Sequence, residues 1–225
     1  MISRYKKNLK ILEKENVYSK EMEHDACGVG LVASTEGKKS RKVVEYGIEA
    51  LKAVWHRGAV DADGKTGDGA GIHLEIPKDF FSEKIELTGH NYDDSEICIG
   101  MIFLPRNNYS AQENSRTLVE KELTKSNFSI YGWRQVPVNP KVLGEKAERT
   151  RPEITQVLFK HNDKKLSNKN LEVKLYESRR KIEKEASIIN LNDFYICSFS
   201  SKSIIYKGMF LAAVSYTHLT LPTKA

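Results

Sequence analysis

The chain has 225 residues, 40% hydrophobic and 29% charged, and a formal net charge of +6. No run approaches the roughly 18 to 20 consecutive apolar residues that span a bilayer, and the amino terminus lacks the apolar stretch of a secretory signal. We therefore expect a cytoplasmic protein with no membrane partner. Basic residues are interleaved with acidic ones, as on solvated helix faces, so no nucleic-acid partner is expected either. The three cysteines are widely spaced and form neither a disulfide framework nor a metal-ligand pattern.

The first sixty residues give three local predictions. Residues 1–26 show no sustained hydrophobic periodicity and are predicted to be a poorly packed leader. The apolar run CGVGLVAS, residues 27–34, is predicted to be a buried strand. Residues 40–58 are predicted to form a helix that Ser40 caps and Gly58 ends, because apolar residues recur there at helical spacing. These residues are Val44, Ile48, Leu51 and Trp55.

The rest of the chain alternates strands and helices. Residues 59–71 are dense in Gly and Asp and predict a loop. Apolar runs bounded by proline or charge predict strands, in the segments 72–77, 97–105, 128–138 and 154–161. Helical spacing predicts two helices, within 111–127 and 170–187, the second with Leu171, Leu175 and Ile182 as its buried stripe. Residues 193–208 are predicted to be two neighbouring strands of a hairpin, which favours a mixed sheet covered by helices.

Cys27 stands at the junction between the charged leader and the apolar run, directly after Ala26. Free cysteine is among the most buried residue types, so one interpretation is a small core residue. Cleavage between Ala26 and Cys27 would instead give Cys27 a thiol with a pKa of about 8.5 and a free α-amine with a pKa of about 7.7 to 8. One residue would then hold both a nucleophile and the base that activates it.

Four sequence blocks carry a resemblance to a known family: EHDACGVGLVAS, ALKAVWHRGAVDADGKTGDGAGIHLEIPKDFF, YGWRQVPVN and DFYICSFSSKSIIYKGM. They resemble the amino-terminal class II glutamine amidotransferase domain of glutamate synthase large subunits. The resemblance implies an α+β protein with the N-terminal nucleophile (Ntn) hydrolase fold, an αββα layered sandwich that is incomplete at the carboxyl end. It also implies a propeptide at 1–26 and a partial amidotransferase domain at 27–212, followed by a non-native, artefactual tail at 213–225.

The resemblance also implies a reaction and its residues. Cleavage after Ala26 would expose Cys27 as the catalytic nucleophile, whose thiolate attacks the side-chain amide of L-glutamine. Ammonia leaves, and water hydrolyses the thioester to glutamate. Arg57, in the block WHRGAV, matches the family arginine that holds the α-carboxylate of glutamine, a role that suits a planar guanidinium. Without the family, an arginine at a helix end is more simply a surface residue.

Further partners and cofactors are implied only for the complete enzyme. There, FMN and an iron–sulfur cluster would serve the reductive amination of 2-oxoglutarate, whereas no cofactor and no metal are expected in residues 1–225. The implied partners are L-glutamine, the remaining synthase domains of the same chain, and an electron donor. The donor is either a small NADPH-oxidising subunit or ferredoxin, and the sequence leaves this choice open.

Other residues near these motifs are expected to be structural. His56 needs no role as a base, because the α-amine fills it in an N-terminal nucleophile enzyme. Thr66 and Asp68 are expected to form a turn that shapes the wall of the site. Cys98 and Cys197 lie in apolar strand runs and are expected to be buried core thiols.

The sequence departs from the family pattern at about Ala213. The family continues into a His-Asn-Gly segment that supplies both oxyanion donors, but this chain ends FLAAVSYTHLTLPTKA. Losing one such donor costs on the order of a hundred- to a thousand-fold in turnover, so these 225 residues alone are expected to be inactive. Two alternatives stay open: another class II amidotransferase, or a non-catalytic basic adaptor protein with an inert Cys27.

Overall fold

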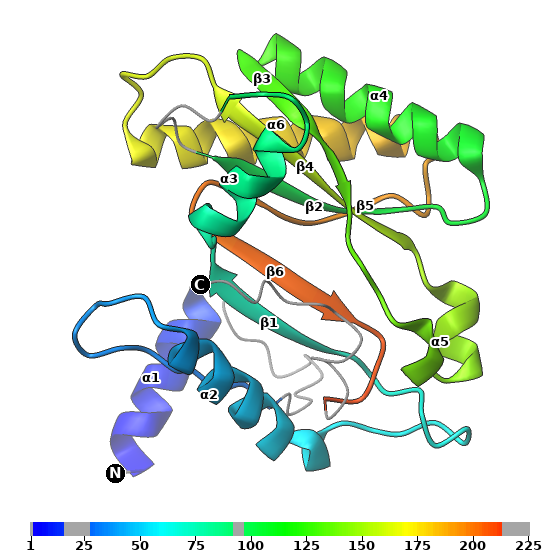
Figure 1. Ribbon diagram of the computed structural model, residues 1–225. Coiled ribbons are helices and arrows are strands. Elements are labelled where there is room, and N and C mark those ends of the chain that lie inside the picture. Colours follow the sequence, from blue (N-terminus) through cyan, green and yellow to red (C-terminus); the bar gives the residue numbers. More distant parts are fainter. Residues whose placement is uncertain (1, 16–27, 92–96, 213–225) are drawn as a thin grey trace.

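The computed structural model describes residues 2–15, 28–91 and 97–212. Within them the elements stack as helices, sheet, sheet and helix (Figure 1). The first layer is α4 (Tyr109–Lys125) and α6 (Asn168–Ile188). The second is an antiparallel sheet in the order β3 (Phe128–Gln135), β4 (Glu153–His161), β2 (Cys98–Leu104) and β5 (Tyr195–Ser200). The third is the antiparallel pair β1 (Ala70–Glu75) and β6 (Ser203–Gly208), and the fourth is α2 (Arg41–Ala53). This order confirms the αββα expectation.

Strand β2 lies at the centre of the larger sheet, between β4 and β5. Its side chains alternate between the two faces, as the period of two in a strand requires. Cys98 and Ile102 pack into the cluster formed with α4 and α6, whereas Ile99 and Met101 pack into the cluster shared with β6. Both faces are buried, which explains why the strand is a continuous apolar run.

Helices α4 and α6 follow the sequence prediction closely. Asn108 caps α4 by accepting a hydrogen bond from the Ala111 amide at 2.9 Å, and Ser167 caps α6. Leu171, Leu175 and Ile182 are buried against the sheet, as their helical spacing predicts. The sequence prediction did not include the helices α3 (Lys78–Glu86) and α5 (Glu145–Thr150).

The predicted hairpin of the last two strands is wrong. Strand β5 pairs with β2 and strand β6 pairs with β1, so the chain passes from one sheet to the other. The two strands meet through side chains: the Ile205 amide donates to Ser198 Oγ at 3.2 Å, and Cys197 Sγ donates to the Ile205 carbonyl at 3.5 Å. The amide and the carbonyl of Ile205 are thus bonded to side chains of β5. In a ladder between β5 and β6 they would bond to the backbone of β5 instead.

The predicted strand at 27–34 is also wrong over its described residues. Residues 28–34 have no regular secondary structure, and the side chains of Val29 and Leu31 are 88% and 91% exposed. A strand exists only where a neighbour pairs its amides and carbonyls, and no described strand pairs with this segment. Apolar composition alone therefore does not fix a strand here.

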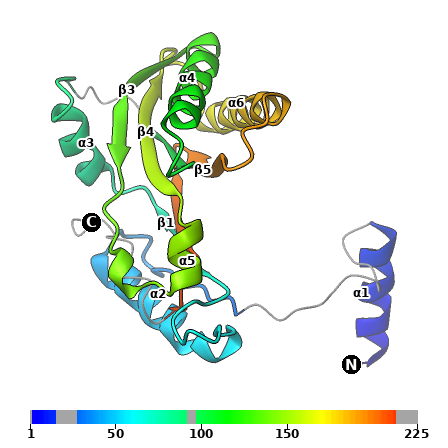
Figure 2. The same ribbon diagram turned by 90° about the vertical axis from the view of Figure 1, so that its right-hand side faces the viewer.

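The leader differs from its prediction in one respect. Residues Ile2–Lys14 form the helix α1, which lies apart from the rest of the described structure in Figure 2. The helix is rich in residues with good intrinsic helix propensity, such as Leu, Lys and Glu, but Ile11 and Leu12 remain 44% and 39% exposed. The expectation of poor packing agrees with this exposure.

Helix α2 begins where the sequence predicts and ends earlier. Ser40 Oγ accepts a hydrogen bond from the Lys42 amide at 3.2 Å, which caps the first turn. The α-helix ends at Ala53 and a 3₁₀ turn, η1 (Trp55–Arg57), follows before Gly58. No residue of α2 is fully buried, because it packs against a sheet of only two strands.

Candidate active-site cavity

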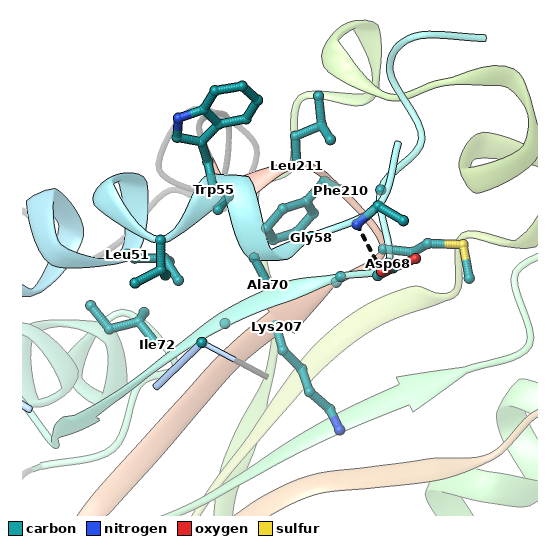
Figure 3. A pocket seen from close by; sticks show the side chains of 18 of the residues that line it. Leu51, Trp55, Gly58, Asp68, Ala70, Ile72, Lys207, Phe210 and Leu211 are labelled. Atoms are coloured by element: carbon teal, nitrogen blue, oxygen red, sulfur yellow. Dashed lines mark hydrogen bonds between the residues drawn. The ribbon is translucent and has the colours of Figure 1, made fainter. Parts of the chain in front are cut away.

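A cavity of about 1340 Å³ opens where η1, the loop 59–69 and the ends of β1 and β6 meet. Figure 3 shows Leu51 and Trp55 on one side of it, Asp68 and Ala70 on the loop and strand, and Phe210 and Leu211 on the other. The lining is mostly apolar and glycine-rich, with few polar groups, which is typical of small-molecule sites. It is therefore the candidate functional site.

The residues that follow the two predicted site residues in the sequence line this cavity. Cys27 and Ala26 lie outside the described residues, but Gly28, the residue after Cys27, lines the cavity. Arg57 is the last residue of η1. The structure describes its backbone but not its side chain, and the next residue, Gly58, lines the same cavity. The structure thus brings the neighbours of both predicted residues, 30 positions apart in the sequence, to one place.

The glycines of TGDGAG let the loop approach the end of β6 closely. A Cβ atom at Gly67 would lie 2.9 Å from the Leu211 side chain and 3.0 Å from the Phe210 backbone. Gly69 has a φ of +119°, which disfavours any L side chain, and a Cβ there would lie 3.2 Å from the Gly208 carbonyl. These contacts show why this part of the cavity wall is made of backbone.

Asp68 and His56 have local structural partners. Asp68 Oδ2 accepts a hydrogen bond from the Ala59 amide at 2.9 Å, which closes the base of the loop (Figure 3). His56 Nδ1 lies 3.2 Å from the Ala53 carbonyl oxygen, at the end of α2. Both contacts agree with the structural roles expected from the sequence.

Lys207 is a cavity residue that the sequence analysis missed. Among the described side chains that line the cavity, it and His73 are the basic ones. Its Nζ donates to Tyr195 Oη at 2.7 Å and lies 4.4 Å from the centroid of the same ring. The available signal was the block YKGM, in which a lysine follows an apolar strand run and precedes glycine.

The two described cysteines are buried, as predicted. Cys98 is 0% exposed and Cys197 is 4% exposed. Burial raises the pKa of the Cys197 thiol to about 11, against a smaller opposing effect of Lys207. The thiolate is the nucleophilic form of cysteine, so Cys197 stays protonated and unreactive near neutral pH.

Two further features of the described residues bear on the type of site. They contain no group of three or more His, Cys, Asp or Glu side chains arranged to hold a metal ion. In the same part of the chain, every helix is too short or too polar to cross a membrane.

Comparison with known proteins gives one family match. The model of the class-II glutamine amidotransferases matches residues 27–220, and this segment begins at Cys27 and contains every residue that lines the cavity.

The chain is also similar to several glutamate synthases. It is 54% identical over 211 residues to the glutamate synthase [NADPH] large chain of Azospirillum brasilense. It is 37% identical over 209 residues to the ferredoxin-dependent glutamate synthase of Pyropia yezoensis and 36% identical over 200 residues to the glutamate synthase [NADPH] large chain of Bacillus subtilis. These matches cover 94%, 91% and 87% of this chain but only 14%, 13% and 13% of the relatives.

Proposed function

The chain belongs to the family of class-II glutamine amidotransferases, and from this premise we propose that it hydrolyses L-glutamine as the amino-terminal part of a glutamate synthase large chain. One observation carries the proposal: Gly28 and Gly58, the neighbours of Cys27 and Arg57, line one cavity. We further propose the division expected from the sequence, a leader at 1–26, the amidotransferase domain at 27–212 and a tail at 213–225.

In the proposed reaction, Cys27 is the first residue of the mature chain. Its α-amine takes the thiol proton, and the sulfur attacks the γ-carbonyl carbon of glutamine. The tetrahedral intermediate then collapses to a thioester. The side-chain nitrogen of glutamine leaves and takes the proton back from the α-amine of Cys27, which releases ammonia. Water then attacks the thioester and releases glutamate, so covalent catalysis divides one high barrier into two lower ones.

Arg57 is proposed to hold the α-carboxylate of glutamine. Its place at the end of η1, next to the cavity-lining Gly58, supports this role. A guanidinium can donate two parallel hydrogen bonds to a carboxylate, which fixes the orientation of the substrate. A lysine supplies only a point charge, so Arg57→Lys is expected to recover part of the glutamine binding that Arg57→Ala loses.

The fate of the ammonia belongs to the longer protein. We propose that it aminates 2-oxoglutarate, which is then reduced, in domains that follow this segment. We also propose, on the resemblance to glutamate synthases, that those domains hold FMN and an iron–sulfur cluster, with either a small NADPH-oxidising subunit or ferredoxin as the electron donor. No cofactor step is proposed for residues 1–225.

The test uses the complete protein that contains this segment. Intact mass is expected to show a chain beginning at Cys27, and Cys27→Ala is expected to abolish glutamate formation from glutamine. The matched control is Cys197→Ala, which removes a buried thiol with a raised pKa and leaves glutaminase turnover in place. A retained leader, together with no glutamate formation from glutamine by the wild-type protein, would overturn the proposal and leave a non-catalytic adaptor as the better description.

A further inference from the structure

Asp63 stands at the tip of the loop 59–69 and accepts hydrogen bonds from several donors. Its Oδ1 accepts from the Thr66 amide at 2.7 Å and from the Lys65 amide at 2.9 Å, and its Oδ2 accepts from the Thr66 hydroxyl at 2.6 Å. The Thr66 hydroxyl first, and then the backbone amides, lower the pKa of Asp63 to about 2. Thr66 itself is 4% exposed, so the exposed Asp63 is held by hydrogen bonds to a buried residue.

The same turn is attached to the start of α5, more than eighty residues later in the chain. The Glu145 backbone makes a small contribution to the lowered pKa of Asp63, and a side chain in place of Gly144 would collide with Asp63 and Thr66. Beside this contact, Lys146 Nζ pairs with Asp61 Oδ2 at 2.9 Å. Helix α5 belongs to the connection between β3 and β4, so the larger sheet supports the tip of the loop.

The turn is also connected to the cavity through the two sides of the loop. The Asp61 amide donates to the Thr66 carbonyl at 2.9 Å, and Val60 and Gly67 form an antiparallel bridge. The bridge residues Val60 and Gly67, together with Asp68, line the cavity and are called its wall residues below. A change at Asp63 therefore reaches the cavity wall through one short, hydrogen-bonded segment.

We propose that Asp63 is a positioning residue for glutamine hydrolysis, which fixes the loop against α5 so that Val60, Gly67 and Asp68 form a rigid wall for the substrate. This inference rests on the proposed function. Asp63 itself does not line the cavity, so it acts through the wall residues. Misplacing a binding element by about 1 Å can cost on the order of a hundred-fold in rate, which sets the scale of the effect.

The test compares a substrate that needs orientation with a reagent that does not. In the complete, mature enzyme, Asp63→Ala is expected to lower kcat/KM for glutamine about 10- to 100-fold, mainly through a higher KM. Reaction with a diazoketone analogue of glutamine should slow in parallel. Alkylation of Cys27 by iodoacetamide should keep its wild-type rate, because this small reagent requires the thiolate and no wall.

Two further variants separate positioning from general loss of structure. Thr66→Val removes the hydroxyl that donates to Asp63 and should give part of the effect, whereas Thr66→Ser keeps the hydroxyl and should restore most glutamine turnover. Lys65→Ala is the matched control on the same loop, because it keeps the backbone amide that donates to Asp63 and removes only an exposed side chain, so it should leave KM unchanged.

Three outcomes are decisive. Wild-type kcat/KM in both Asp63→Ala and Thr66→Val would overturn the inference, as would an equal loss of glutamine turnover and iodoacetamide reactivity in both variants. A selective loss of turnover that Thr66→Ser does not share would support it. Failure of the proposed function is read separately, since the wild-type enzyme itself would then show no Cys27-dependent turnover.

Discussion

The two sheets of this protein are packed to different degrees. In the four-stranded sheet, Ile99 and Ile102 of β2 are both 0% exposed, and helices α4 and α6 bury a stripe against it. Against the two-stranded sheet, α2 buries no residue completely, and Trp55 at its end is 62% exposed. The cavity lies on the less buried side. Segments that bind substrates are commonly drawn from the less stable parts of a fold, held in place by a rigid scaffold.

The contacts between the two halves show how the scaffold reaches the cavity. Buried Gln156 of β4 donates to Tyr206 Oη of β6 at 3.1 Å, and Arg134 of β3 donates to Gln156 Oε1 at 2.8 Å. Together with the attachment of Asp63 to α5, these bonds tie β6 and the loop to the larger sheet. The larger sheet therefore helps to hold the less buried half in position.

The largest expected effect compares the same substitution in the two halves. Ile102→Ala removes a fully buried side chain between the large sheet and its helices and should cost about 2–5 kcal/mol of local unfolding free energy. Ile48→Ala in α2 removes a half-buried side chain and gains helix propensity, so it should cost less than about 1 kcal/mol. Native-state hydrogen exchange of the two segments measures both values. Equal costs would show that the two halves are equally well packed.

A glycine in the cavity wall gives the next largest effect. Gly67→Ala places a methyl group 2.9 Å from Leu211 and 3.0 Å from the Phe210 backbone, and such overpacking typically costs about 1–3 kcal/mol. Gly30→Ala is the control, since its nearest neighbour is the Ala50 side chain at an ordinary 3.8 Å. Thermal melting of the two variants should separate them. A neutral Gly67→Ala would show that the chain end after β6 yields easily and that this wall is not rigid.

The difference between the halves also decides how much the sequence could predict. In the larger half, local signals agree with the structure: the buried run of β2 and the helical stripe of Leu171, Leu175 and Ile182 specify their own burial. Ser40 likewise caps α2, because a capping hydrogen bond involves only neighbouring residues. Such features depend on a few consecutive residues and survive in any tertiary context.

The features that the sequence did not reveal depend on residues far apart in the chain. The partners of β5 and β6 differ because side chains such as Ser198 occupy the space between these strands, and no local pattern encodes this. The apolar run at 28–34 has no described partner strand. The close approach of Gly144 to Asp63 joins residues 81 positions apart. For the site, the block TGDGAG indicated a wall, but Lys207 and Asp63 gained a role only from their neighbours in space.

The smallest expected effect is a pH dependence confined to acid. Hydrogen bonds lower the pKa of Asp63 from 3.8 to about 2, so its ionised carboxylate stabilises the loop above pH 3.8, and this contribution is lost as the pH falls toward 2. The difference in melting temperature between the wild type and Asp63→Asn should therefore be constant from pH 7 to about 5 and shrink below about 4. A difference that grows as the pH falls would show that the protonated carboxyl group is the form the loop prefers, and the stabilising role of the hydrogen bonds to the Asp63 carboxylate would then be wrong.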